Sequence, residues 1–178
     1  MNPSRDLHDA PEAVDVASIE EIVTEHSAAV YRLARSVVQD ASLADDVTQE
    51  TFIKVWRNLD SFRGESSMRS WILRIAHNTA VSTLRKIRDS ATDPVKLPED
   101  QNPIGTTQVV EGRLAADQLV AALATFDDLT REIVVLREIE GMAYEDIADT
   151  LGVPVPTVKT RLLRARRRLS TILEGWRS

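Results

Sequence analysis

The chain has 178 residues, with 22 lysines and arginines against 28 aspartates and glutamates, so its formal net charge is −6. Hydrophobic residues make up 43% of the sequence, which is enough for a folded core and argues against wholesale disorder. Cysteine is absent, and this excludes disulfides, zinc–thiolate sites, a cysteine nucleophile and a thiol redox switch within this chain.

The N-terminal residues mix proline, aspartate, histidine and glutamate without an apolar core, which is not the pattern of a signal peptide. The longest purely apolar runs are only a few residues, far short of the roughly 20 that cross a bilayer. We therefore expect a soluble cytoplasmic protein with no membrane insertion, which begins with a disordered tail over residues 1–17.

Three helices are predicted in the long proline-free stretch that follows the tail. Apolar residues at three- and four-residue steps predict one helix over residues 18–38. A second helix is expected to begin at Ser42 as its N-cap, and a third near Ser66 or Ser67. Short turns join the three helices, so residues 18–89 are expected to form an antiparallel bundle.

Residues 90–112 are rich in Pro, Asp, Gly and Thr and lack apolar periodicity, which predicts a linker. The linker region is acidic, because residues 91–118 carry two basic and five acidic side chains. Helical periodicity returns over residues 113–178, and no stretch alternates apolar with polar residues as a strand does. The predicted fold is all-α, with two small helical domains joined by a flexible linker.

A helix-turn-helix pattern lies in the second predicted domain. Ala148, Gly152 and Val158 supply a small residue where two helices cross, a residue tolerant of a left-handed backbone, and an apolar anchor. Pro156 falls in the first turn of the second helix, where proline is tolerated. Residues 159–168 hold six basic side chains and no acidic one, which fits either DNA contact or a merely solvated helical face.

The second predicted helix carries a cluster of exposed carboxylates near its start. Asp45, Asp46, Gln49 and Glu50 gather on about one turn. Their charges fit either a solvated N-terminal turn favoured by the helix dipole or a docking surface for a partner. The tryptophans Trp56 and Trp71 are expected to pack in the core.

Aromatic side chains lie among cations between residues 61 and 88, a combination typical of single-strand binding. Phe62 lies in a predicted turn, where it could stack on a base or fold back on the core. Asn78 can donate and accept hydrogen bonds in one plane, the geometry that reads a base edge. No His, Asp or Glu set has metal-ligand spacing, so no metal or cofactor is predicted. Candidate phosphate partners are Arg63, Arg69, Arg74, Arg85, Lys86 and Arg88.

Two stretches stand in order on either side of the predicted linker: DDVTQETFIKVWRNLDSFRGESSMRSWILRIAHNTAVSTLRK (45–86) and LREIEGMAYEDIADTLGVPVPTVKTRLLRARRRL (136–169). Together they resemble bacterial RNA polymerase sigma factors of the extracytoplasmic-function type, group four of the sigma-70 family. The resemblance implies an alternative sigma factor that binds core RNA polymerase, recognises −35 and −10 promoter elements and promotes promoter melting. Residues 18–89 would be sigma region two and residues 113–178 sigma region four.

The resemblance also implies a role for each surface. The helix that begins DDVTQE would dock on the clamp helices of the β′ subunit through Asp45, Asp46, Gln49, Glu50 and Lys54. The −10 strand would be held by Phe62, Arg63, Arg69, Trp71, Arg74, Asn78, Arg85 and Lys86, with Phe62 and Asn78 lining a pocket for a flipped base. The −35 element would be read by Thr157, Lys159, Thr160, Arg161, Leu163, Arg164, Arg167 and Arg168. Region four would also rest on the β flap, and an anti-sigma protein would sequester the factor until a stress releases it.

Two other classes fit parts of the pattern. A helix-turn-helix regulator acting without polymerase would need a dimerisation or ligand domain, yet residues 18–88 carry no pocket signature. An enzyme acting on nucleic acid would need a nucleophile or metal-holding carboxylates, which are missing, so no enzyme is expected. We further expect the free chain to bind duplex DNA poorly, because its acidic segments repel phosphate until polymerase separates the domains.

Overall fold

The structure, a computed structural model, describes residues 16–90 and 121–175, with side chains over residues 19–90 and 121–172. Every regular element within these ranges is helical, so the predicted all-α fold is confirmed. The predicted tail and linker, together with residues 113–120, lie almost entirely outside the described residues.

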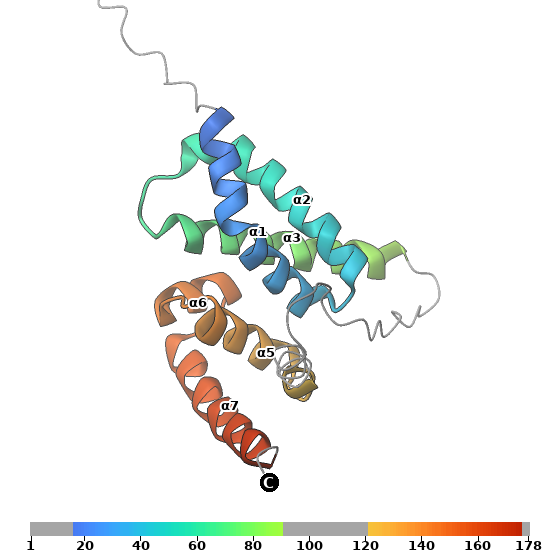
Figure 1. Cartoon of the computed structure of the whole chain (residues 1–178), viewed down its shortest axis with the longest axis vertical. Coiled ribbons are helices and arrows are strands. Elements are labelled where there is room, and N and C mark those ends of the chain that lie inside the picture. The colour runs from blue at the N-terminus through green and yellow to red at the C-terminus, as the bar shows by residue number, and fades with distance from the viewer. Residues whose placement is uncertain (1–15, 91–120, 176–178) are drawn as a thin grey trace, which may run out of the picture.

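Three long helices form the first unit, which we call unit one (residues 16–90). These are α1 (Val16–Val38), α2 (Ala41–Asn58) and α3 (Met68–Ser90), with a short 3-10 turn, η1 (Leu59–Ser61), after α2. Each helix packs against the other two, as the predicted bundle requires (Figure 1). The side chains buried between them include Val30, Leu33, Val47, Val55, Ile72 and Leu73.

The second unit, which we call unit two, spans residues 121–175. Residues 121–124 are helical, and α5 (Asp128–Val134) runs on into a π-helical turn, η2 (Val135–Ile139). The last two helices are α6 (Tyr144–Leu151) and α7 (Val155–Gly175). Their buried inner faces include Ile133, Leu136, Ile147, Val158 and Leu162.

The helix-turn-helix forms between α6 and α7 as the sequence pattern predicts. Gly152 ends α6 with φ +66°, a left-handed conformation that costs glycine little. The Val153 N–H donates to the Ala148 carbonyl oxygen at 3.0 Å and closes the turn. Pro156 lies in the first turn of α7, where its missing N–H leaves no helical bond unmade.

The N-cap of α2 differs from the prediction. Gln39 has φ +56°, which ends α1 and leaves Asp40 in an extended conformation. The Asp40 carboxylate accepts a hydrogen bond from the Leu43 N–H at 2.7 Å, so Asp40 caps the helix and Ser42 lies inside it. The expected cap at Ser42 was wrong because the left-handed residue that sets the cap is not visible in local sequence.

The two units pack against each other through α1 and α3 of unit one. Helix α5 and the π turn η2 contact α1, and α6 contacts α3. Figure 1 shows α5 and α6 beneath the three-helix bundle and α7 on the far side of unit two. Helix α7 packs mainly on α5 and α6 of its own unit.

His26 makes unit one sensitive to acid. Its side chain is buried, its Nδ1 has no hydrogen-bond partner among residues 16–90 and 121–175, and burial lowers its pKa below the ordinary 6.5. The unfolded chain thus takes up a proton before the folded one, so stability present above pH 6.5 is lost as the pH falls below it. We expect His26→Gln to lose less unfolding free energy than the wild type between about pH 7.5 and pH 5.5 in urea titrations. An identical loss in both proteins would contradict this.

Candidate nucleic-acid interface

Helix α7 carries all the residues predicted to read the −35 element. Its residues Val158, Leu162 and Ala165 are buried in the core of unit two. Thr157 and Arg161 are half-buried at the edge of that contact, and Leu163 is 51% exposed. The remaining predicted residues, Lys159, Thr160, Arg164, Arg167 and Arg168, are exposed. One face of α7 thus carries the whole predicted set within reach of a polyanion.

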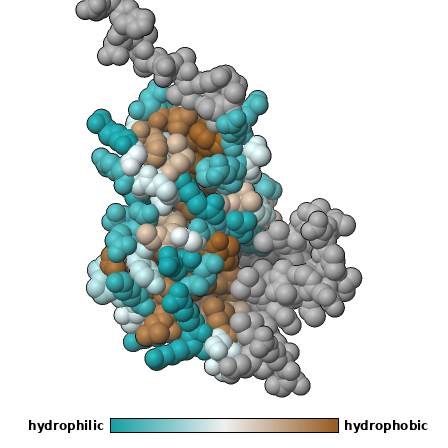
Figure 2. Space-filling model, turned by 60° about the vertical axis from the view of Figure 1, so that its left-hand side comes forward, coloured by the Kyte–Doolittle hydropathy of each residue, from teal (hydrophilic) through white to brown (hydrophobic). Residues whose placement is uncertain are grey.

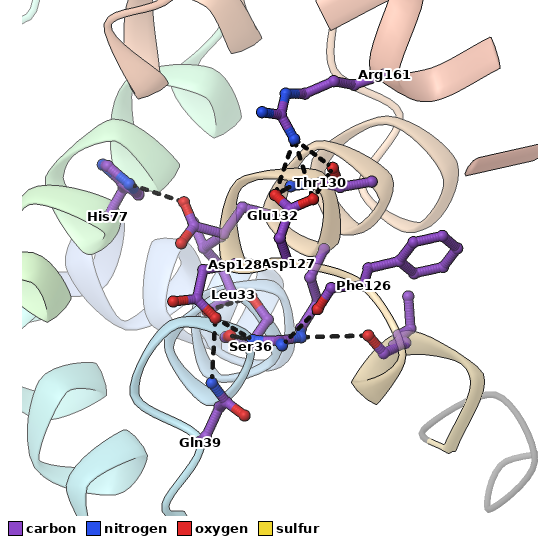
Figure 3. A network of polar contacts seen from close by, with 12 residues as sticks. Leu33, Ser36, Gln39, His77, Phe126, Asp127, Asp128, Thr130, Glu132 and Arg161 are labelled. Atoms are coloured by element: carbon purple, nitrogen blue, oxygen red, sulfur yellow. Dashed lines mark hydrogen bonds and ion pairs between the residues drawn. The ribbon is translucent and has the colours of Figure 1, made fainter. Parts of the chain in front are cut away.

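Arg161 differs from the exposed cations of α7, because it is bound by residues at the start of α5. Its Nη1 donates to both carboxylate oxygens of Asp127, at 2.8 and 3.0 Å, and to Thr130 Oγ1 at 2.8 Å (Figure 3). Desolvation raises the pKa of Asp127, but hydrogen bonds from Thr130 and the Arg161 charge outweigh it, so the pKa is lowered overall. Arg161 therefore anchors α7 on α5 and lines the groove between them, together with Pro156, Thr157, Thr160, Arg164 and Arg168.

Two residues beside this face were missed by the sequence reasoning. The Arg137 guanidinium lies 4.7 Å from the centre of the Tyr144 ring, and Lys159 Nζ lies 5.5 Å from the same ring. Tyr144 thus carries two cations on its ring, one of them from the predicted set. The three residues come from η2, α6 and α7, so no local spacing in the sequence connects them.

Helix α3 gathers much of the predicted −10 set on one face. Trp71, Arg74, Asn78 and Arg85 follow each other at helical three-, four- and seven-residue steps, with Lys86 beside them. Asn78, Arg85 and Lys86 are exposed, as is Arg63 in the preceding loop. The buried Arg74 Nε has no hydrogen-bond partner among the described residues.

Phe62 folds back on this face and does not project into solvent. It is half-buried, and its ring centre lies 5.3 Å from that of Trp71 with an angle of 50° between the planes. Of the two alternatives predicted for Phe62, projection from the turn or folding back on the core, the structure shows the second. Phe62 and Trp71 together form an aromatic pair, a platform on which a base could stack. The exposed Asn78 lies about two helical turns further along the same face of α3.

Arg69 lies apart from the rest of the predicted −10 set. It stands about half a helical turn round α3 from Trp71, facing unit two. Its side chain pairs with the carboxylate of Glu140, and its Nε donates to the Glu140 backbone oxygen at 3.2 Å. Arg32 of α1 joins the same carboxylate, and this hydrogen bond raises the pKa of Arg32.

The predicted docking surface lies on α2. Asp45, Asp46 and Gln49 are exposed, whereas Glu50 is half-buried and pairs with Lys54 at 2.9 Å. The hydrogen bond from Lys54 lowers the pKa of Glu50, so this carboxylate stays ionised. Lys54 also donates to Thr79 Oγ1 at 3.1 Å, which ties the pair to α3.

An apolar groove between α1 and α2 adjoins these carboxylates. Trp56 is 62% exposed and Ile53 is 47% exposed, so the expectation that Trp56 packs in the core was wrong. The buried stripe of α2 runs through Val47, Thr51 and Val55, which leaves Trp56 on the neighbouring face. Figure 2 shows hydrophobic side chains near the upper end of the molecule, where Figure 1 places the start of α1 and the end of α2. The groove is lined by Ile19, Val23, Ser27, Thr48, Gln49, Phe52, Ile53 and Trp56.

Within residues 16–90 and 121–175, none of the helices combines the length and the hydropathy of a membrane span. Across the same residues, histidine, aspartate and glutamate side chains form no group of three or more that could hold a metal ion.

Comparison with known protein families finds two matches. The family described as "Sigma-70 region 2" matches residues 22–90, and the family described as "Sigma-70, region 4" matches residues 116–169. The RNA polymerase sigma-H factor of Pseudomonas aeruginosa is 33% identical over 170 residues, which cover 90% of this chain and 88% of that protein. The ECF RNA polymerase sigma factor SigE of Mycolicibacterium smegmatis is 39% identical over 88% of this chain and 62% of its own length.

Two solved structures share the fold over most of the chain. The sigma factor RpoE of Bartonella quintana, in complex with the anti-sigma factor NepR, superposes with a TM-score of 0.73 at 28% identity. That match covers 89% of this chain and 98% of RpoE. CnrH, in complex with the cytosolic domain of CnrY, gives a TM-score of 0.63 at 29% identity, with 91% of each chain covered.

Proposed function

We propose how this chain, which belongs to the extracytoplasmic-function group of bacterial RNA polymerase sigma factors, divides promoter recognition between its two units. It is an alternative sigma factor that acts with core RNA polymerase in transcription initiation. Unit one docks on the polymerase and captures the −10 strand, and unit two reads the −35 element. The boundaries proposed for these regions are residues 18–89 and 113–178, joined by the acidic linker over residues 90–112. The observation that carries this assignment is the exposed basic face of α7, which packs against its helix-turn-helix partner α6.

The docking surface is proposed to combine charge with apolar area. Asp45, Asp46, Gln49, Glu50 and Lys54 supply polar contacts for the β′ clamp helices, and the groove beside them supplies burial. An exposed tryptophan next to an apolar groove is the kind of residue that contributes most to protein–protein affinity. We extend the predicted docking set by Ile53 and Trp56, which the structure leaves uncovered.

The strand-binding surface is proposed to lie on the α3 face that holds Trp71, Arg74, Asn78, Arg85 and Lys86. A base that leaves the duplex can stack on the aromatic pair of Phe62 and Trp71, while cations hold the backbone phosphates. Such capture offsets the cost of unstacking, so melted promoter is favoured over duplex. The factor acts by binding alone and catalyses no covalent step of its own.

The −35 reader is proposed to use the N-terminal half of α7 for base edges and its later arginines for phosphates. Arg137 and Tyr144 extend this set, because Arg137 lies over the same tyrosine ring as Lys159 of the predicted set. Unit two is also proposed to rest on the β flap. An anti-sigma partner is proposed too, since the matched RpoE and CnrH structures are complexes with such partners. The site of action is the cytoplasm, where polymerase meets the chromosome.

Reconstituted transcription tests the proposed function. The purified chain is mixed with core polymerase and a genomic promoter library, which includes its own upstream region. We expect a defined subset of start sites that core polymerase alone does not use. Specific binding of an operator by the isolated chain, with no start-site selection on adding polymerase, would favour an operator-binding regulator.

Arg164 and Arg137 are expected to differ in the kind of defect they produce. Arg164→Ala should weaken transcription roughly five- to a hundredfold, and only from promoters with the preferred −35 sequence, because a base contact is lost. Arg137→Ala should weaken all promoters alike and reduce the salt dependence of binding, because a phosphate contact is lost. Transcription across a set of −35 variants at several salt concentrations measures both. Equal losses on every −35 variant would remove Arg164 from the base-reading set.

A further inference from the structure

Glu140 stands out as a charged side chain with no exposure to solvent. Its carboxylate is 0% exposed, although it follows the π turn η2 close to the surface of unit two. Arg32 donates to it twice, through Nε at 2.7 Å and Nη2 at 3.0 Å, and Arg69 pairs with the same group. Both arginines belong to unit one. A buried carboxylate is tolerated only when paired and hydrogen-bonded, so Glu140 depends on the other unit for its charge to be compensated.

Buried apolar side chains of both units belong to one hydrophobic cluster, and further hydrogen bonds join the units around it. Ser70 Oγ donates to Asp146 at 2.7 Å, His77 Nε2 lies 3.1 Å from Glu132, and Gln39 donates to Asp128 at 3.4 Å. In each of these pairs the carboxylate comes from unit two. In one further contact unit two supplies the donor: Arg131 Nη1 donates to the Ser36 backbone oxygen of unit one at 3.3 Å. The interface therefore combines apolar packing with polar contacts, as do domain interfaces that resemble transient complexes and can separate and re-form.

From this geometry we propose that Glu140 is a latch that holds the two units of the free chain together, and that the latch must release Arg32 and Arg69 before both promoter elements can be bound. The latch itself is a property of the free chain. Its consequence for promoter binding rests on the function proposed above.

When the two units are packed together, which we call the closed chain, they are too short to reach both promoter elements at once. Elements named −35 and −10 lie about 25 base pairs apart, or roughly 85 Å along B-form DNA at about 3.4 Å per base pair. Unit one is about 35 Å long, because α1 and α3 have 23 residues each at about 1.5 Å per residue, and the 21-residue α7 makes unit two about 30 Å long. The two units in contact therefore reach about 65 Å at most. The 30 residues from 91 to 120 could span about 100 Å if extended, so the covalent connection permits the units to separate.

Release of the latch also frees a predicted DNA contact. Arg69 belongs to the predicted −10 set, and in the closed chain its guanidinium is paired with Glu140. In the closed chain this cation is withheld from DNA by an ion pair, in addition to the repulsion expected from the acidic segments.

The absence of cysteine allows a direct test with paired labels. Ser82→Cys on α3 and Asp149→Cys on α6, both exposed, carry spin labels whose separation is measured by pulsed electron resonance without polymerase or DNA. We expect one short distance in the otherwise wild-type chain. With Glu140→Gln the distance should lengthen and broaden, and the ratio of closed to open chain should fall at least about tenfold.

Glu138→Gln is the matched control, because Glu138 lies two residues away and pairs at 2.7 Å with Arg166 of its own unit. It should leave the distance unchanged. Arg32→Gln should open the chain as Glu140→Gln does, and the double variant should open it little further, because both changes remove one contact. Circular dichroism checks that helix content is kept. If Glu140→Gln fails to fold, the distance measured in Arg32→Gln tests the latch instead, because Arg32 is partly exposed.

A wild-type chain that already shows a long, broad distance would overturn the latch, as would equal distances in Glu140→Gln and Glu138→Gln. These results come from the free chain alone. A failure of the latch is therefore separate from a failure of the proposed function, which the reconstituted transcription assay measures.

Discussion

Trp56→Ala is expected to weaken binding to core polymerase about thirtyfold or more while leaving the fold intact. Trp56 is 62% exposed at the edge of the groove between α1 and α2, so its removal exposes no core. Truncation of an exposed tryptophan that anchors an interface costs about 2 kcal/mol or more in binding. By contrast, a surface change of this kind alters stability by about 0.5 kcal/mol at most.

Fluorescence titration of labelled protein with core polymerase measures the affinity, and urea unfolding measures the stability. Val81→Ala is the control, because Val81 is also an exposed apolar residue of unit one but lies outside the groove. Trp56→Phe should retain part of the affinity. If Trp56→Ala binds core polymerase as tightly as Val81→Ala does, the groove is not part of the docking surface.

Phe62→Ala and Asn78→Ala are expected to impair promoter opening by roughly ten- to a hundredfold with little change in polymerase binding. Phe62 forms the aromatic pair with Trp71, and Asn78 is exposed on the same face of α3, about two helical turns after Trp71. Loss of one stacking contact with a base costs about 1–3 kcal/mol. Because this contact is made only with an unpaired base, the closed promoter complex should be unaffected.

A promoter with a pre-melted −10 region separates melting from later steps. Permanganate reactivity of unpaired thymines reports opening on the duplex promoter, and transcription from the pre-melted template should recover much of the lost activity. Phe62→Tyr, which keeps a stacking ring, should behave nearly as the wild type. Equal loss of core binding and of opening would contradict the assignment of this face to the strand.

Local sequence was sufficient for the elements of both units. The spacing of apolar residues predicts α1, α2 and α3, and Ala148, Gly152 and Val158 predict the turn between α6 and α7. Such features depend on residues a few positions apart, which a periodic pattern records directly. The cap of α2 could not be placed in this way, because Asp40 becomes the cap only after Gln39 adopts a left-handed conformation.

The surfaces were predicted less completely than the helices. The cations of α7 stand close together in sequence, and their exposure follows from the buried stripe of one helix. Tyr144 and Arg137 were missed because their partners come from other elements. Trp56 was placed in the core because a large aromatic is usually buried, yet the packing of α1 on α2 leaves it uncovered.

By itself, the sequence determined that this chain is helical, where its recognition helix begins, and which family it resembles, because each of these is written in short-range order along the chain. Only the tertiary structure decided that Arg69 faces unit two and that Glu140 loses its water to two arginines of unit one. Glu140 lies 108 and 71 positions from those arginines. Contacts across such separations arise when two folded units meet, and no local pattern of residues encodes them.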